Sequence, residues 1–246
     1  MHLKVIACEV LAREVYYCAA RARHTADVEL ITQGLHDNPD IGRERLQARI
    51  DAAAPATHSA VVLGYGLCSN MAVGLRAGAV PLVIPRAHDC ITLLLGSKER
   101  YAENFRDHPG TYYYSAGWLE YPERGGERVE LVQKSGLGPA LAYEELVSKY
   151  GEENARYLAE TLSSWIVHYT HGTLIEFEFT RGADYERQVR QICRQKGWEF
   201  ARLQGDLGLL QRALDGEWSD EEFVVLQPGD RLDASHDECI LRALRR

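Results

Sequence analysis

The sequence predicts an α/β fold built on mainly parallel sheets. Short apolar runs recur along the chain, among them residues 3–7, 59–66 and 81–85. Each run is almost continuously hydrophobic, which is typical of parallel strands that are buried on both faces. Helical patterns separate the runs, and strands that alternate with helices favour an open, parallel α/β sheet.

The first 110 residues contain four strand–helix pairs in succession. The expected strands are residues 3–7, 27–35, 59–66 and 81–85. The expected helices are residues 9–23, 41–54, 69–78 and 88–97, and a polar helix follows over 97–110. Asp40 and Asp89 precede helical patterns, so both are predicted N-caps.

The alternation of strands and helices stops after residue 110 and resumes later in the chain. Residues 111–121 are aromatic and expected to be extended, 123–131 form a loop or hairpin, and 139–151 and 152–169 are helical. Strands are then expected at 173–180, 198–204 and 221–228, and helices at 184–197, 206–218 and 235–246. The predicted organisation is an N-terminal lobe (1–110), an aromatic and helical connector (111–170) and a C-terminal lobe (171–246). Both lobes are expected to be Rossmann-like.

Composition narrows the classes of protein. The net charge is −8, and no cluster of lysines and arginines provides a surface for nucleic acid. No apolar run is long enough for a membrane span, and the first residues read as a strand rather than a signal peptide. Six cysteines in 246 residues are too few for a disulfide scaffold. We therefore expect a cytoplasmic globular protein.

Three cysteines stand at equivalent places. Cys8, Cys68 and Cys90 each come just after an apolar run and near the start of a helical pattern. Ligands of open α/β sheets bind at the carboxyl ends of the strands, and a helix N-terminus lowers the pKa of a thiol. Three thiolates from neighbouring strands can hold an iron–sulfur cluster with one open iron, or a zinc ion. The alternative interpretation is that the three cysteines are simply small residues that fit tight turns. Cys18 and Cys193 lie within helical patterns and are expected to be buried core residues.

Several residues beside the cysteines are candidates for chemistry. His88 is a candidate acid/base, and Glu9, next to Cys8, is a second candidate catalytic group. Arg86 follows a strand directly and is suited to an anionic substrate, although a surface ion pair explains it equally well. Helix capping is the simpler role for Asp89, and a favourable position at a helix start the simpler role for Glu9.

Other residues are candidates for substrate binding. Tyr65 lies between two glycines in the segment GYGLC, which lets the backbone approach a ligand closely but does not match a dinucleotide-binding motif. His36 lies at the end of the second strand, on the same predicted edge. Tyr112 and Tyr113 belong to an aromatic stretch of the kind that lines pockets, although core packing is the alternative.

The residues also resemble a known family. The segments LGYGLC at 63–68, PLVIPRAHDCITLLLGSKERY at 81–101 and PGTYYYSAGW at 109–118 are similar to the bacterial branch of the domain of unknown function 1638 family. GLH near residue 34 and a late GWEF…GDLGLL segment match as well, so the resemblance covers nearly the whole chain. It implies an association with corrinoid-dependent methyltransferases, and hence a methyltransferase partner.

These observations lead to one main hypothesis and two alternatives. The main hypothesis is an enzyme with an iron–sulfur cluster on the three cysteines that acts on a small sulfur-bearing or methylated molecule. Lyase, desulfurase and methyl-transfer chemistry all fit it. The alternatives are a non-enzymatic accessory protein that binds a metal or cofactor for a corrinoid methyltransferase system, and a zinc-thiolate methyltransferase.

Overall fold

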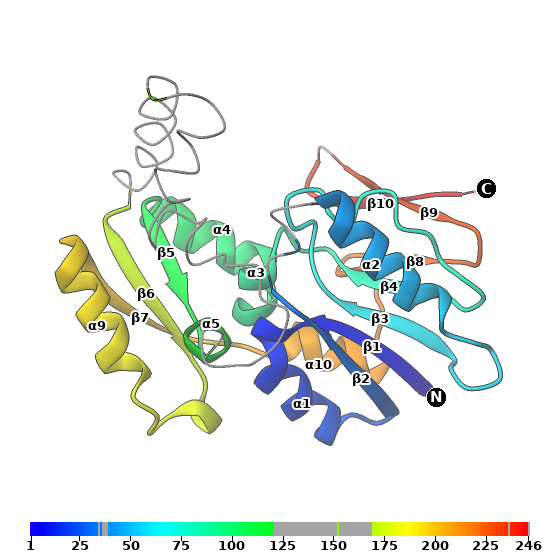
Figure 1. Cartoon of the computed structure of the whole chain (residues 1–246), viewed down its shortest axis with the longest axis horizontal. Helices are drawn as coiled ribbons and strands as arrows, with labels where there is room; N and C mark the ends of the chain where they lie inside the picture. Colours follow the sequence, from blue (N-terminus) through cyan, green and yellow to red (C-terminus); the bar gives the residue numbers. More distant parts are fainter. Residues whose placement is uncertain (34, 36–38, 121–151, 153–168, 236, 246) are drawn as a thin grey trace.

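The predicted α/β class is confirmed by the computed structural model, which describes residues 1–33, 35, 39–120, 152, 169–235 and 237–245. Within these residues two mainly parallel sheets carry helices on their faces (Figure 1). Most of the predicted connector lies outside the described residues, including the loop or hairpin over 123–131 and the helices over 139–151 and 152–169. His36 lies outside them as well.

The larger sheet has five strands in the order β2-β1-β3-β4-β8. The strands are β1 (His2–Cys8), β2 (Thr25–Ile31), β3 (Ala60–Gly64), β4 (Leu82–Pro85) and β8 (Phe223–Leu226). The first four in this order are parallel, whereas β8 runs antiparallel to β4. β8 falls within the predicted C-terminal lobe (171–246), but in the structure it completes the sheet of the N-terminal lobe.

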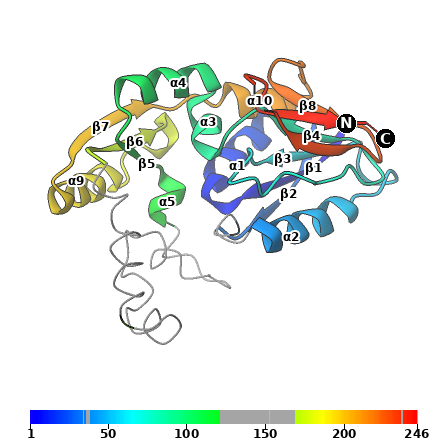
Figure 2. The same ribbon diagram turned by 90° about the horizontal axis from the view of Figure 1, so that it is seen from above.

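Helices cover both faces of this sheet. One face carries α1 (Ala12–Arg21) and α10 (Gly208–Asp215), and the other carries α2 (Pro39–Asp51) (Figures 1 and 2). Val5 packs in the core beneath α1 and α10, and its neighbour Ile6 packs in the core beneath α2. This alternation explains the continuous apolar run in β1, because both faces of the strand are buried. Cys18 is buried in the first of these cores, as predicted.

The smaller sheet is parallel and has the order β5-β6-β7. Its strands are β5 (Thr111–Tyr114), β6 (His171–Glu176) and β7 (Glu199–Gln204). The helix α9 (Tyr185–Lys196) packs against this sheet and buries Cys193. The aromatic stretch at 111–121 is extended only over β5, because α5 (Ala116–Glu120) begins directly after it. The 3-10 helix η5 (Glu178–Thr180) follows β6.

Short elements complete the first half of the chain. The 3-10 helix η1 (Glu9–Leu11) joins β1 to α1, and α3 (Cys90–Leu95) and α4 (Lys98–Asp107) connect β4 to β5. Asp89 caps α3 as predicted, because its side chain accepts from the backbone N–H groups of Ile91 and Thr92.

The predicted helix over residues 69–78 is wrong, since the structure has successive turns there. Cys68, Ser69 and Asn70 have φ values of 46°, 56° and 64°. These values belong to the left-handed region, which a right-handed helix cannot include. The backbone therefore turns sharply after Cys68 instead of starting a helix.

The predicted helix over 235–246 is also wrong. Residues Leu241–Leu244 form β10, which pairs antiparallel with β9 (Arg231–Ala234). Leu241 is fully buried and its neighbour Arg242 is exposed, so burial follows the period of a strand. Separately, none of the helices in the described part of the chain is both long and apolar enough to cross a bilayer.

Candidate functional site

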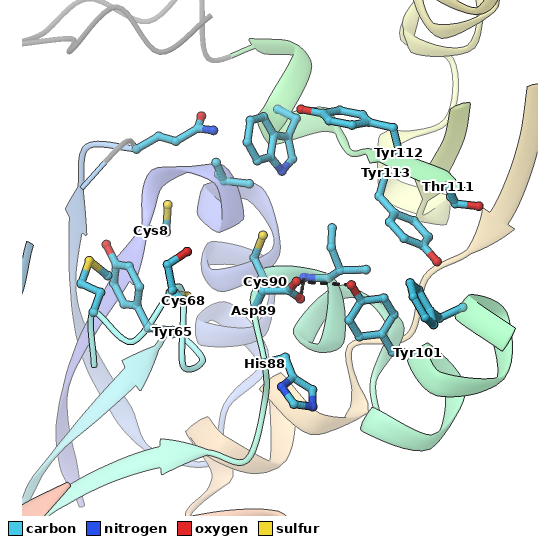
Figure 3. A pocket seen from close by; sticks show the side chains of 18 of the residues that line it. Cys8, Tyr65, Cys68, His88, Asp89, Cys90, Tyr101, Thr111, Tyr112 and Tyr113 are labelled. Carbon is cyan, nitrogen blue, oxygen red and sulfur yellow. Dashed lines mark hydrogen bonds between the residues drawn. The ribbon is translucent and has the colours of Figure 1, made fainter. Parts of the chain in front are cut away.

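The structure brings Cys8, Cys68 and Cys90 to one edge of the larger sheet (Figure 3). Cys8 is the last residue of β1, Cys68 follows the turn after β3, and Cys90 begins α3 just after β4. Because β1, β3 and β4 are neighbouring parallel strands, their carboxyl ends meet. The thiols lie close together: burial raises the pKa of Cys90, and the nearby Asp89, Cys68 and Cys8 raise it further.

Backbone hydrogen bonds fix the turn of Cys68 against the turn of Cys90. The Leu67 N–H donates to Ala87 O at 2.8 Å, and the Cys68 N–H donates to His88 O at 2.9 Å. A β-carbon at Gly66 would lie 2.5 Å from Ala87 O, so only glycine allows this approach. The glycine of the GYGLC segment thus positions one cysteine relative to another.

The three cysteines open onto a cavity of about 570 Å³ that lies between the two sheets. Its first wall comes from the larger sheet and its turns, with Tyr65, Cys68 and Cys90. The opposite wall comes from β5 and α5, with Tyr112, Tyr113 and Trp118. The wall is mainly apolar and aromatic, and no lysine or arginine is among the described residues that line it. Such a cavity suits a small molecule.

Trp118 is placed in the cavity by a close contact of α5. A β-carbon at Gly117 would lie 1.7 Å from the Val10 carbonyl oxygen, so α5 packs directly on η1. This contact places the indole N–H of Trp118 next to the Cys90 thiol, whose pKa it lowers. The indole Nε1 of Trp118 is buried and has no conventional hydrogen-bond partner among the described residues, so its N–H is available to favour the thiolate of Cys90.

The pKa values of the thiols differ from the prediction. Burial raises the pKa of Cys8 to about 11 and that of Cys68 to about 12, and burial also raises the pKa of Cys90 well above its usual value. The expected lowering by a helix N-terminus is outweighed, because loss of water disfavours the thiolate more strongly. The metal-free thiols are accordingly neutral at pH 7, and metal binding would release their protons.

Two further polar groups face this region without a conventional hydrogen bond to a described residue. The Tyr65 hydroxyl is buried, and its pKa is raised by burial and by the nearby Cys8 and Cys68. The side-chain oxygen of Gln33 is also buried. Buried polar atoms normally have hydrogen-bond partners, so a group bound in the cavity would supply partners for these two oxygen atoms.

Tyr113 and Tyr112 belong to different parts of the opposite wall. Tyr113 contacts Tyr101 edge to face, with ring centroids 5.8 Å apart, and its hydroxyl donates to Asn104. The hydroxyl of Tyr101 donates in turn to Asp89. Tyr112 packs between the rings of Tyr114 and Trp198, with its own ring on the cavity. Both predicted substrate-binding tyrosines of β5 therefore line the cavity.

The two predicted catalytic residues have different positions. His88 lines the outer part of the cavity and is exposed, and its ring is directed away from Cys90 (Figure 3). Glu9 is not among the lining residues, and its carboxylate accepts a hydrogen bond from the backbone N–H of Gln33 at 3.1 Å. His88 is thus directed away from the thiols, whereas Glu9 is close enough to Cys8 to add to the rise in the pKa of that thiol that burial causes.

Arg86 is likewise outside the lining of the cavity. Its guanidinium donates to the backbone carbonyl oxygens of Asp220 at 2.8 Å and Cys239 at 2.9 Å, and also to that of Leu241. These contacts fasten the C-terminal hairpin to the end of β4. The structure places Arg86 where it supports the fold rather than where it meets a ligand of the cavity.

Several lining residues were not predicted as site residues, among them Gln33 and Tyr101, whereas Trp118 belongs to the aromatic stretch that was expected to line a pocket. Gln33 follows β2, Tyr101 belongs to α4 and Trp118 belongs to α5. Gln33 obeys the same rule that identified the cysteines, since it comes just after the carboxyl end of a strand. Nothing in the spacing of Tyr101 and Trp118 indicates that they approach Cys90, because packing between distant segments decides it.

The spacing of the thiols distinguishes between metal centres. The three Sγ atoms are not all within 4.8 Å of one another, since the only described group of three ligand atoms that satisfies this limit lies elsewhere. Zinc–sulfur bonds of about 2.3 Å place the sulfurs of a tetrahedral site about 3.8 Å apart. A cluster binds each thiolate through a separate iron and accepts a wider spacing. A single zinc ion would therefore require at least one of the three thiols to move toward the others.

Comparison with known proteins identifies the family but no characterised relative. A search of curated proteins finds no match, and a search of solved structures finds none either. The model of a family described as protein of unknown function (DUF1638) matches residues 30–214. This range includes Cys68, Cys90 and both strands that carry them, and it covers well over half of the 246 residues. The chain belongs to the DUF1638 family.

Proposed function

We propose that this protein is an enzyme that holds an iron–sulfur cluster on Cys8, Cys68 and Cys90 and acts on a small sulfur-bearing or methylated molecule. One observation carries the proposal: three thiols from three neighbouring strands open onto a single cavity of about 570 Å³. Three protein ligands leave one iron of a four-iron cluster open, and that iron would act as a Lewis acid toward a sulfur or oxygen atom of the substrate.

The residues around the thiols support this role. Trp118 provides an N–H beside Cys90, and Tyr65 provides a hydroxyl beside Cys8. Hydrogen bonds to the ligand sulfurs stabilise bound thiolates and tune a metal centre. The rings of Tyr101, Tyr112 and Tyr113 line the same space.

The lining also indicates the class of substrate. No lysine or arginine is among the described residues of the lining, so a phosphate or a polycarboxylate would find neither of these cations there. Aromatic rings with a few polar groups suit a compact, weakly polar molecule. A methyl thioether, a thiol or a methylated amine has this character, and lyase, desulfurase and methyl-transfer reactions on such molecules all agree with the site.

A second candidate function is favoured by the positions of the two expected catalytic groups. The His88 ring is directed away from Cys90, and the Glu9 carboxylate accepts from a backbone N–H. A site whose predicted acid/base, His88, is directed away from the thiols suits a protein that stores or delivers a metal or cofactor. Such an accessory protein would serve a methyltransferase of the corrinoid type.

Metal analysis of anaerobically purified protein tests the cluster. We expect iron and sulfide in the wild-type protein, with a broad absorbance at about 400 nm from thiolate-bound iron. Cys8→Ala, Cys68→Ala and Cys90→Ala should each lose iron, whereas Cys239→Ala, whose thiol is exposed outside the cavity, should keep it. A colourless protein with stoichiometric zinc would favour the zinc-thiolate alternative. A metal-free wild type together with a folded, metal-independent Cys68→Ala variant would overturn the metal site.

Turnover separates the enzyme from the accessory protein. The loaded protein is incubated with a small methyl thioether, a thiol or a methylated amine, and products are followed by mass spectrometry. Repeated turnover that Cys68→Ala abolishes supports the enzyme. Stoichiometric binding without turnover, followed by transfer of the bound group to a corrinoid methyltransferase, supports the accessory role.

A further inference from the structure

A second group of ligand atoms lies at the opposite edge of the larger sheet. His2, Asp27 and His58 each present one atom, and these three atoms are all within 4.8 Å of one another. Nε2 of His2 is 3.0 Å from Oδ2 of Asp27, and Nε2 of His58 is 3.2 Å from the same oxygen. His2 begins β1 and Cys8 ends it, so at about 3.3 Å per residue the group lies about 20 Å from the cysteines.

The strands hold this arrangement in place. Asp27 of β2 is in register with Lys4 of β1, and His2 and Lys4 share one face of β1 because they are two positions apart. The Ser59 N–H donates to His2 O at 2.7 Å, and the His2 N–H donates to the Ser59 hydroxyl. These bonds fix His58, the neighbour of Ser59, beside the start of β1.

The contacts of His58 place its Nε2 atom 3.2 Å from Asp27 Oδ2. The Thr57 hydroxyl lies 3.2 Å from Ala54 O and 2.9 Å from Nδ1 of His58. When Nδ1 carries the ring proton, Nε2 presents a lone pair toward Asp27 Oδ2, and a cation shared by the two atoms would replace their direct contact. A donor from the second ring nitrogen to an oxygen is the arrangement that orients histidines in metal sites.

The surroundings of His2 and Asp27 also favour a bound cation. Nε2 of His2 is inaccessible to solvent and has no hydrogen-bond geometry to a described atom, although Asp27 Oδ2 is only 3.0 Å away. The nearest lysine, Lys4, pairs instead with Glu29 at 3.2 Å. In the described part of the chain Asp27 has ion-pair contacts only with His2 and His58.

We propose that His2, Asp27 and His58 form a binding site for a divalent transition metal, with zinc as the preferred ion. Zinc–nitrogen bonds of about 2.0–2.1 Å place two ligand atoms of a tetrahedral site about 3.3 Å apart, close to the measured 3.0 and 3.2 Å. Two imidazoles and one carboxylate are ligands that zinc accepts, with a fourth position left for water. The ion would join β1, β2 and the segment before β3, and it is independent of the cysteine cavity.

Zinc binding to matched variants tests the site. Untagged protein is stripped with a chelator, equilibrated with micromolar zinc chloride, desalted and analysed for metal. Relative to wild type, Asp27→Asn and His58→Ala should each bind one zinc ion fewer per chain. His24→Ala is the control, because this nearby histidine contacts the N-terminal amine and not Asp27, and it should bind as wild type does. Zinc should raise the thermal midpoint of wild type and His24→Ala but not of Asp27→Asn.

The visible absorption of bound cobalt(II) distinguishes this site from the thiols. Cobalt(II) bound by His2, Asp27 and His58 should show weak visible bands that persist in Cys68→Ala and disappear in His58→Ala. Thiolate ligation would instead produce intense charge-transfer absorption that Cys68→Ala removes. Equal zinc content in wild type, Asp27→Asn and His58→Ala would overturn the proposal, as would binding seen only at millimolar zinc. Chelator-treated variants with the thermal midpoint of chelator-treated wild type exclude misfolding as the cause of a loss.

Discussion

Gly117 of α5 packs so closely on Val10 of η1 that a β-carbon at residue 117 would lie 1.7 Å from the Val10 carbonyl oxygen. This contact links two distant parts of the chain at the cavity, because Val10 follows Cys8 by two residues and Gly117 directly precedes Trp118. The distance between the two walls of the cavity is therefore set by backbone contact, which tolerates almost no displacement.

Gly117→Ala tests the importance of this contact. The added methyl group meets backbone atoms, which cannot rotate away as a side chain can, so α5 must move off η1. We expect a loss of about 1–3 kcal/mol in the free energy of unfolding, measured by urea denaturation. Gly78→Ala is the matched control: its β-carbon would meet the nearest atoms at 3.4 Å, and its stability should change little. Equal stability of both variants would contradict the contact.

Trp118→Phe tests the donor beside Cys90. The substitution keeps an aromatic ring but removes the indole N–H that lowers the pKa of the thiol. If the cluster is present, its reduction potential should become more negative, because a hydrogen bond to sulfur stabilises the more negatively charged reduced state. Protein-film voltammetry measures the shift. Trp218→Phe, whose lost N–H donates to Ala213 O far from the thiols, should leave the potential unchanged.

Local sequence patterns predicted the strands better than their assembly. The continuous apolar runs at β1, β3 and β4 identify strands that are buried on both faces. β8 was found as a strand, yet its pairing with β4 depends on a return of the chain that no local pattern contains. The C-terminal hairpin also depends on contacts between distant segments. Pairing with β9 and the contacts of Arg86 decide the conformation of β10, and they override the helix propensity of its residues.

The candidate site was likewise predicted only in part from the sequence. The placement of three cysteines after three strands followed from the rule for parallel sheets. Their raised pKa values did not follow, because burial is a property of the assembled walls. Trp118 and Tyr101 reach the cysteines through packing between segments far apart in the sequence. The position of Arg86 directly after a strand predicts a contact with an anion, but the carbonyl oxygens to which it donates come from the distant C-terminal segment.

Asp89→Ala and Asp89→Asn test the start of α3. The Asp89 carboxylate accepts from Ile91 N at 3.0 Å and from Thr92 N at 3.3 Å. Alanine removes this cap at a cost of about 0.5–2 kcal/mol, whereas asparagine keeps a side-chain oxygen and most of the stability. Loss of the cap should also loosen the first turn and speed the alkylation of Cys90, relative to buried Cys193 in the same chain. Mass spectrometry measures both rates, and an unchanged ratio in Asp89→Ala would show that the cap does not restrain Cys90.

Arg86→Ala tests whether Arg86 binds a ligand or holds the C-terminal hairpin. The substitution leaves the carbonyl oxygens of Asp220, Cys239 and Leu241 without their shared donor. Because hydrogen bonds from a charged group each contribute about 1.5–3 kcal/mol, we expect a loss of at least that order in the free energy of unfolding. The exposed Arg242→Ala, which removes a pair with Asp233, should cost much less. Iron content and ligand binding in the cavity should be unchanged in Arg86→Ala under conditions where it is folded. A variant with wild-type stability that no longer binds an anionic ligand would instead restore the role of Arg86 in substrate binding.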